Sequence, residues 1–373
     1  MSAEAITTDA YIVVERRGNA GLITLNRPKA LNALSLQMVR DVTAALLGFK
    51  SDPGVAMVAI RGSNKVGKPG MPEALFGGFC AGGDIRFFHT AALAGDPALG
   101  EFFTEEYALN HLIHNYPKPY IAFMDGVVMG GGMGLSQGSK TRIVTEHTKM
   151  AMPETNIGLF PDVGGGYFLS RCPGHVGEYL ALTGEVIGAE EAIDYGLADV
   201  KVDAARLPEL WAALGATQFD VLDATYLGAA RAYKKGATTL KQSQIETHFG
   251  LLRVKHIVDS LEKAKDDVWA KKTASVLRKR SPLMLHVTLE QIRLARTMSL
   301  ADDLRMERDM VHNCFNLRPG AASETVEGIR ALAVDKDYLP KWSPERIEDV
   351  KPGKADAFFV SPWAADAHPL KHL

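Results

Sequence analysis

Two carboxylates and two clusters of glycine lie close together within residues 120–169 of the chain. Glu154 and Asp162 each follow a proline, and glycine clusters at residues 130–132 and 164–166 flank them. Glycine lets a backbone amide approach a ligand closely, and a glycine cluster that opens a helix presents free N–H groups at the positive end of the helix dipole. Carboxylates beside such amides predict a site where negative charge develops on a carbonyl oxygen.

A second group of backbone amides is expected in the segment FCAGGD, residues 79–84, which follows a glycine-rich loop and precedes a helix. The N–H of Ala81 or Gly82 could donate to an oxyanion there. Taken alone, the segment is better explained as an ordinary junction between a loop and a helix, with Asp84 in the first turn. The glycine-rich helix start at residues 130–132 favours the functional interpretation, because a thioester oxygen needs two donors.

The two carboxylates have structural explanations as well as a catalytic one. Glu154 could cap a helix or form a salt bridge, and Asp162 could be the N-cap of the glycine turn that follows it. In the catalytic interpretation the pair divides the work, one residue acting as base or nucleophile and the other as acid or orienting group, if their surroundings separate their pKa values. Spacing alone leaves both interpretations open.

These side chains need a scaffold, and the pattern of the chain predicts an α/β fold. Strand-like and helical runs alternate up to about residue 205, beginning with a hairpin over residues 11–25 and a helix capped by Ser35. Beyond that point strand signals vanish and helical periodicity takes over. We therefore expect an α/β core over residues 1–204, a helical C-terminal region over residues 205–345 and an irregular tail over residues 346–373.

Composition limits the classes of function. The 373 residues carry a net charge of −2, which argues against nucleic acid or an anionic membrane surface as the main partner. The three cysteines form no disulfide pattern, and the N-terminus has no apolar core of the signal-peptide type. No apolar run is long enough to span a bilayer, so we expect a cytoplasmic protein. The eleven histidines are scattered, so we expect no metal site.

Several segments resemble a known family. The phrases at residues 26–34 (NRPKALNAL), 79–84 (FCAGGD) and 130–132 (GGG) are similar to those of the enoyl-CoA hydratase/isomerase superfamily, also called the crotonase superfamily. Within it, the phrases at residues 102–107 (FFTEEY) and 152–169 most resemble the 3-hydroxyisobutyryl-CoA hydrolases. The resemblance extends to about residue 345 and implies a fold of repeated ββα units.

The resemblance also implies a substrate and roles for individual residues. The substrate would be a coenzyme A thioester, with no separate cofactor. The amides of Ala81 and Gly131 would hold the thioester oxygen, Glu154 and Asp162 would be the catalytic carboxylates, and Glu106 would line the substrate pocket. The coenzyme would lie along Lys29, Ala30, Ala81, Gly82, Gly83 and Asp84. Relatives are often trimers, so a homo-oligomer is expected unless the C-terminal helices cover the usual interface.

One departure from the family pattern bears on the reaction. Hydratases of the family carry a glutamate two positions after the glycine cluster, where this chain has Gly134, and they tend to have glycine where this chain has Asp162. Loss of one acid and gain of another favours hydrolysis of the thioester of 3-hydroxyisobutyryl-CoA or 3-hydroxypropionyl-CoA, a step of valine catabolism. The alternatives are an enoyl-CoA hydratase or isomerase with a rearranged acid pair, and an inactive acyl-CoA-binding protein.

Overall fold

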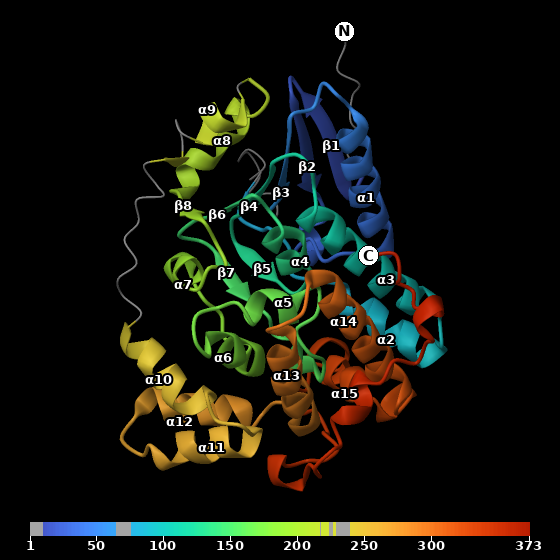
Figure 1. The fold of residues 1–373 in the computed structure, drawn as a ribbon, viewed down its shortest axis with the longest axis vertical. Helices are drawn as coiled ribbons and strands as arrows, with labels where there is room; N and C mark the ends of the chain where they lie inside the picture. The colour runs from blue at the N-terminus through green and yellow to red at the C-terminus, as the bar shows by residue number, and fades with distance from the viewer. Residues whose placement is uncertain (1–9, 65–75, 217, 224–226, 229–238) are drawn as a thin grey trace.

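A sheet of six strands forms the centre of the computed structural model, which describes residues 10–64, 76–216, 218–223, 227–228 and 239–373 (Figure 1). The strands lie in the order β1-β2-β3-β4-β6-β8. Strands β1 and β2 form an antiparallel hairpin, and every later pair is parallel. The strands are β1 (Ile12–Arg17), β2 (Ala20–Leu25), β3 (Met57–Gly62), β4 (Tyr120–Met124), β6 (Thr141–Val144) and β8 (Val200–Lys201).

A smaller sheet leads the chain to both carboxylates and to the first glycine cluster. It pairs β5 (Val127–Met129) with β7 (Lys149–Ala151) in parallel. Strand β5 runs through Gly130 into helix α4 (Gly131–Gln137), and β7 runs into the short 3-10 helix Glu154–Ile157. Because the carboxyl ends of parallel neighbours meet at one edge, the glycine cluster and Glu154 are brought together there.

Helix α1 (Leu36–Ser51) packs against β1 and β2 (Figure 1). Helix α3 (Ala98–His114) packs against α1, and α2 (Ile85–Ala94) packs against α3. The Ser35 hydroxyl caps α1 by accepting a hydrogen bond from the Met38 amide at 3.3 Å, as the sequence predicts. Three phenylalanines join α2 to α3: the ring of Phe88 lies 4.9 Å from those of both Phe102 and Phe103. This aromatic cluster fixes the face of α3 that carries Glu106.

After β8 the described residues contain helices and no strand, so the prediction of an α/β fold with a helical C-terminal region is confirmed. The domain boundaries drawn from the sequence stay predictions. Three α-helices lie between β7 and β8: α5 (Gly165–Leu169), α6 (Val176–Thr183) and α7 (Ala189–Asp194). The α-helices described after β8 are α8 (Leu207–Ala213), α9 (Phe219–Leu222), α10 (Thr239–Phe249), α11 (Val254–Lys263), α12 (Val268–Leu277), α13 (Pro282–Ala295), α14 (Leu300–Asn316) and α15 (Glu324–Ile329). Helix α15 continues into a π-helical turn, Arg330–Val334.

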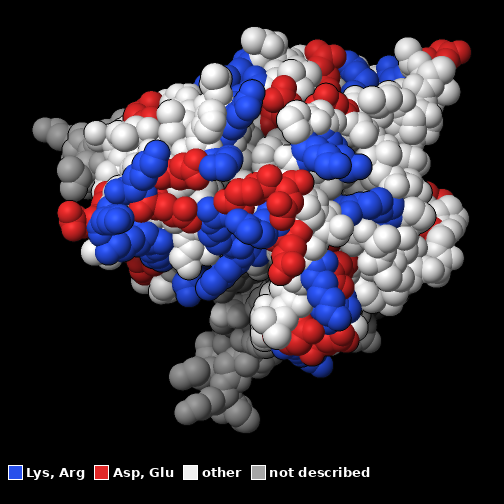
Figure 2. All heavy atoms as spheres, turned by 90° about the horizontal axis from the view of Figure 1, so that it is seen from below, with Lys and Arg blue, Asp and Glu red and all other residues white. Residues whose placement is uncertain are grey.

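The lower face of the molecule interleaves positive and negative side chains (Figure 2). Arg278, which follows the last residue of α12, forms ion pairs with Glu262 of α11 at 2.8 Å and with Glu348 of the tail at 2.6 Å. Such exposed pairs contribute little stability one by one, but a network of them joins segments that are far apart in the sequence. Within the described residues, no helix is both long enough and apolar enough to cross a membrane.

Candidate active site

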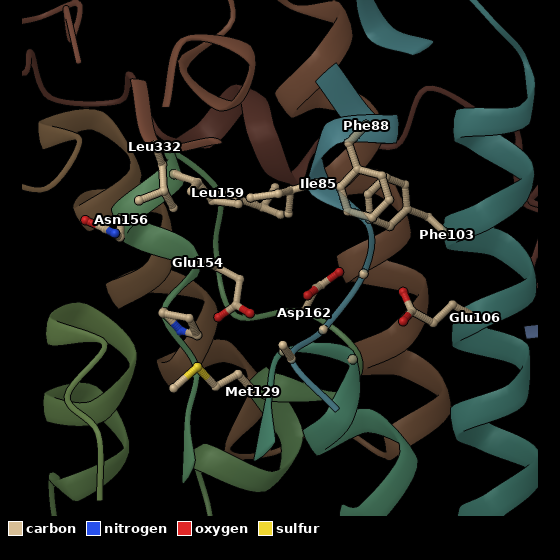
Figure 3. Close-up of a pocket in the computed structure, with 17 residues that line it drawn as sticks. Ile85, Phe88, Phe103, Glu106, Met129, Glu154, Asn156, Leu159, Asp162 and Leu332 are labelled. Carbon is tan, nitrogen blue, oxygen red and sulfur yellow. The ribbon is translucent and has the colours of Figure 1, made fainter. Parts of the chain in front are cut away.

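A cavity of about 230 Å³ lies between the glycine-rich segments, helix α3 and the C-terminal region. Three acidic side chains, Glu106, Glu154 and Asp162, lie on one side of it (Figure 3). Apolar side chains form the opposite wall, and this wall consists of Ile85, Phe88, Phe103, Leu159 and Leu332. The cavity thus presents carboxyl groups to one part of a ligand and a hydrocarbon surface to the other.

Glu154 and Asp162 point into this cavity from two different segments (Figure 3). Both are buried, with exposed fractions of 7% and 6%. The Tyr107 hydroxyl donates to Asp162 Oδ2 at 2.9 Å, whereas Glu154 Oε2 has no hydrogen-bond partner among the described residues. The structural alternative for Asp162 is wrong, because its side chain bonds Tyr107 and the N-cap of α5 is Gly164. The carboxylate of Glu154 is left available to a substrate.

Glu106 approaches the same cavity from α3. Its Oε1 atom is buried and has no hydrogen-bond partner among the described residues. A Cβ atom at Gly131 would lie 2.6 Å from that oxygen, and one at Gly130 would lie 2.9 Å from Glu154 Oε1. Any side chain at these two positions would therefore displace a carboxylate, which explains why glycine is needed on this stretch.

Burial changes the acidity of all three carboxyl groups. Burial raises the pKa of Asp162 to about 6, although the hydrogen bond from Tyr107 opposes the rise. Burial also raises the pKa of Glu154 well above its usual value, and the charge of Asp162 raises it further. The pKa of Glu106 is raised by burial and then by the charges of Asp162 and Glu154. Carboxyl groups with raised pKa values can exchange protons near neutral pH, as acid–base catalysis requires.

Some backbone N–H groups of residues 79–84 already donate a hydrogen bond to another described residue, and others do not. The Ala81 amide donates to the Leu31 carbonyl at 3.0 Å. This bond uses the N–H of Ala81, which corrects the expectation that Ala81 is an oxyanion donor. The amides of Gly82, Gly83 and Gly131 have no acceptor among the described residues. Gly83 and Gly131 both line the cavity and are close neighbours, since a Cβ at Gly131 would lie 3.5 Å from the Gly82 carbonyl carbon.

No acid occupies the place where family hydratases have one. A Cβ atom at Gly134 would lie 2.7 Å from both Asn110 Nδ2 and Val163 Cβ. Asn110 is itself buried, with an exposed fraction of 4%, and neither of its side-chain polar atoms has a partner among the described residues. The space beside α4 is thus filled by Asn110 and Val163, and a longer side chain at position 134 does not fit.

A second cavity of about 540 Å³ adjoins the first and shares Ala81, Gly83 and Ile85 with it. Of the residues expected along the coenzyme, Gly82 lines the first cavity and Lys29, Ala30, Ala81, Gly83 and Asp84 line the second. Arg27 also lines it, held by Asp84 at 2.9 Å, and so does Arg86. No ion pair involves Lys29 or Arg86 among the described residues, so both cations can meet an anionic ligand.

The structure adds residues that the sequence analysis did not single out. Tyr107 follows Glu106 in the phrase at residues 102–107, so that phrase carried a signal for it. No sequence signal linked Leu332 and Ala333 to the site, because they lie in the C-terminal region, more than a hundred residues from the catalytic segments. Leu332 lines the first cavity and Ala333 the second. Within the described residues, no group of three or more His, Cys, Asp or Glu side chains is arranged to hold a metal ion.

Comparison with known proteins agrees with this geometry. A model of the enoyl-CoA hydratase/isomerase family matches residues 20–359. The mitochondrial 3-hydroxyisobutyryl-CoA hydrolase of Xenopus tropicalis is 39% identical over 361 residues, covering 95% of this chain and 89% of the relative. The 3-hydroxyisobutyryl-CoA hydrolase 1 of Arabidopsis thaliana is 36% identical over 368 residues, covering 96% and 93%.

Solved structures share the fold over the same extent. A structure described as a carnitinyl-CoA dehydratase from Mycobacterium thermoresistibile is 36% identical, with a TM-score of 0.83 and coverage of 94% of this chain and 97% of that one. A structure described as an enoyl-CoA hydratase from Rhodobacter sphaeroides is 35% identical, with a TM-score of 0.81 and coverage of 95% and 98%. The predicted fold is confirmed, and the chain belongs to the enoyl-CoA hydratase/isomerase, or crotonase, family.

Proposed function

We propose that the chain is an acyl-CoA thioester hydrolase that converts 3-hydroxyisobutyryl-CoA to 3-hydroxyisobutyrate and free coenzyme A, a step of valine catabolism. It would accept 3-hydroxypropionyl-CoA as a second substrate. The observation that carries the proposal is the pair of buried carboxylates, Glu154 and Asp162, in a cavity with no acid at Gly134. The similarity to curated 3-hydroxyisobutyryl-CoA hydrolases over nearly the whole chain supports it.

In the proposed mechanism, the thioester oxygen lies between the amides of Gly83 and Gly131. These donors form the oxyanion hole, and such a donor is worth about 100-fold or more in rate. Glu154 then acts by one of two routes. It attacks the carbonyl carbon, expelling the coenzyme A thiolate and leaving an anhydride that water cleaves, or it removes a proton from the water that attacks. Label in Glu154 after one turnover in ¹⁸O-labelled water would identify the anhydride route, with water attacking the Glu154 carbonyl of the anhydride.

Asp162 has two proposed tasks, and both use its position opposite Glu154. It protonates the departing sulfur, or it accepts a hydrogen bond from the 3-hydroxyl of the acyl group, while Tyr107 holds the carboxyl group in place. A comparison of 3-hydroxyisobutyryl-CoA with isobutyryl-CoA distinguishes them. If Asp162 binds the hydroxyl, Asp162→Asn removes much of the preference for the hydroxylated substrate. If Asp162 protonates sulfur, the variant slows both substrates alike.

A second candidate function is hydration or isomerisation of an enoyl-CoA, because both similar structures are described as a hydratase or a dehydratase. The missing acid at Gly134, where Asn110 and Val163 fill the space, argues against it. The deciding experiment measures thiol release from 3-hydroxyisobutyryl-CoA beside hydration of crotonyl-CoA. Thiol release without hydration supports the hydrolase, and the reverse supports the hydratase. Tight coenzyme A binding with neither reaction would identify an inactive binding protein.

The catalytic assignment has its own test. Glu154→Gln and Asp162→Asn are expected to lower kcat for thiol release by about 100-fold or more while the variants stay folded, because each loses an acid–base group. Near-normal rates in both folded variants would overturn the assignment.

The reaction as proposed needs no cofactor besides the coenzyme A of the substrate. The carboxylates and amides of the cavity supply the acid–base and oxyanion groups themselves. Dialysis against a chelator is therefore expected to leave the rate of thiol release unchanged, and recovery of activity only on adding a metal would contradict this.

We further propose that the reaction takes place in the cytoplasm, since the three cysteines are buried and free, as in a reducing compartment. Several relatives are named mitochondrial, so fractionation of the source cells is the direct test. Formation of a homo-oligomer stays a prediction that light scattering can measure.

A further inference from the structure

Two carboxylates outside the cavity hold the turn that carries Asp162. Asp303 and Glu307 lie one helical turn apart on α14, and both are fully buried. Glu307 accepts hydrogen bonds from the Gly164 amide at 2.8 Å and from the Gly166 amide at 2.9 Å. Asp303 accepts one from the Tyr167 amide at 2.8 Å. The free amides at the start of α5 are thus satisfied by the side chains of another helix.

The same network reaches the residue before Asp162. The Gln291 side chain of α13 donates to the Pro161 carbonyl at 2.6 Å and to Glu307 Oε1 at 3.1 Å. The Asp162 carbonyl in turn accepts a hydrogen bond from the Gly165 amide at 2.8 Å. Side chains of α13 and α14 therefore form hydrogen bonds with the backbone on both sides of Asp162.

The turn needs such support because its backbone is strained. Val163 has a φ of +57°, a conformation that a β-branched residue adopts only at a cost. Gly164 follows with a φ of +85°, and a Cβ atom at Gly166 would lie 2.3 Å from Asp303 Oδ1. The network keeps Asp162 aimed at the cavity although the intervening Val163 favours a different backbone conformation.

The two carboxyl groups differ in how many hydrogen bonds they accept from N–H groups. Burial raises the pKa of Asp303 to about 7, and burial together with Asp303 raises the pKa of Glu307. Glu307 accepts hydrogen bonds from three N–H groups and Asp303 from only one, and the bonds from Gly164 and Gly166 oppose the rise in the pKa of Glu307.

We infer that Glu307 is a positioning residue for Asp162: its carboxylate holds the turn at residues 161–166 in the conformation that presents Asp162 to the substrate. The inference rests on the proposed function of Asp162. Glu307 does not line the cavity, so it acts through the turn and not on the substrate.

The hydrogen bonds predict that matched variants of the two acids behave differently. In Glu307→Gln, one carboxylate oxygen becomes an NH₂ group, which must face the amide of Gly164 or Gly166, so one donor loses its acceptor. In Asp303→Asn, the amide oxygen keeps the hydrogen bond from the Tyr167 N–H group, and the NH₂ group takes the place of Oδ1, which has no hydrogen-bond partner among the described residues. We expect kcat for thiol release to fall about 100-fold in Glu307→Gln, with KM and coenzyme A affinity nearly unchanged, and about 3-fold or less in Asp303→Asn.

A double-mutant cycle with Asp162→Asn separates positioning from general damage. If Glu307 acts through Asp162, Glu307→Gln lowers kcat little further once Asp162 has been replaced. Equal losses in both backgrounds would overturn the inference. If Glu307→Gln fails to fold, Gln291→Met removes two hydrogen bonds of the network and should lower kcat in the same Asp162-dependent way, to a smaller extent.

Hydrogen exchange measures how firmly the turn is held, and it does so without a catalytic assay. Exchange of a peptide covering residues 161–169 should be about 10-fold faster in Glu307→Gln and unchanged in Asp303→Asn. If the wild-type protein releases no thiol, the proposed function fails, yet this exchange result still tests whether Glu307 holds the turn. Wild-type exchange in Glu307→Gln would overturn the inference whatever the substrate.

Discussion

The three buried carboxyl groups around the cavity lower the free energy of unfolding when they are charged. Burial, together with the neighbouring acids in the case of Glu106 and Glu154, raises the pKa of Glu106, Glu154 and Asp162 above their ordinary values. The folded protein then binds protons more tightly than the unfolded chain. Stability is therefore greatest below the pKa of an unfolded carboxyl group and is lost as the pH rises toward the folded value, which for Asp162 is about 6.

Replacement of one of these acids by its amide should relieve that cost. We expect Glu106→Gln to raise the melting temperature at about pH 8 by an amount on the order of 2 °C, and by less at about pH 5, where more of the carboxyl groups are protonated. Thermal unfolding of both proteins at the two pH values measures the effect. A lower melting temperature for Glu106→Gln at the higher pH would contradict the cause given for its raised pKa.

Gly134 gives a second prediction at the scale of a residue. Alanine normally stabilises a helix relative to glycine, by up to about 1 kcal/mol. At position 134 the new methyl group would collide with Asn110 and Val163, and overpacking of this kind costs roughly 1–3 kcal/mol. We expect Gly134→Ala to be destabilised in urea unfolding and Gly48→Ala, whose site in α1 is open, to be stabilised. Two stabilised variants would show that the space beside α4 is not filled.

The sequence predicted most residues of the site because they carry local signals. Glu154 and Asp162 stand beside glycine clusters, and Glu106 lies in a recognisable phrase. The amide donor was misplaced at Ala81, because a loop sequence does not reveal that this N–H is already bonded to Leu31. Glu307 gave no signal of burial, since acidic residues in an amphipathic helix usually face water.

At the scale of elements, the π-helical turn Arg330–Val334 forms part of the cavity wall. Leu332 of this turn lies on the apolar wall of the cavity, and Arg330 anchors the turn through ion pairs with Glu327, Asp335 and Asp337. One methylene group in an apolar pocket changes substrate discrimination by about 1–3 kcal/mol. A smaller side chain at Leu332 should therefore admit longer acyl groups.

We expect Leu332→Ala to raise the ratio of kcat/KM for 3-hydroxyhexanoyl-CoA over that for 3-hydroxyisobutyryl-CoA by about 10-fold. Because both kcat/KM values are measured on the same protein, a smaller folded fraction lowers both equally and leaves their ratio unchanged. Leu339→Ala is the matched control, because that leucine is 72% exposed and does not line the cavity. Equal ratios in wild type and Leu332→Ala would show that another element sets the acyl length.

The helical periodicity of the C-terminal region predicted helices there but not the segments that they contact. Two of the helices found in that region are α13 (Pro282–Ala295) and α14 (Leu300–Asn316). Helical periodicity reports which positions are apolar, but it does not say which distant loop a helix will touch. The contact of α14 with Gly164 spans more than a hundred residues, so it came only from the structure.

At the scale of the whole molecule, one buried side chain of the body binds three backbone carbonyls of the tail. Asn313 of α14 donates hydrogen bonds to the carbonyls of Ala357, Phe358 and Val360. No sequence pattern in the tail predicted this. Asn313→Ala leaves the buried Phe358 carbonyl and two partly buried carbonyls without their donor, and we expect the free energy of unfolding to fall by roughly 2 kcal/mol. Urea unfolding measures it, and an unchanged midpoint and slope would show that these three hydrogen bonds contribute nothing to stability.

Because Leu332 and Ala333 line the two cavities, the structure also predicts how activity depends on protein concentration. One chain supplies the wall residues described above, from Arg27 near one end to Ala333 near the other. By mass action, a site shared between subunits empties when the protein is diluted below its dissociation constant, whereas a site within one chain does not. Turnover per mole of this protein should accordingly be the same at nanomolar and at micromolar concentration.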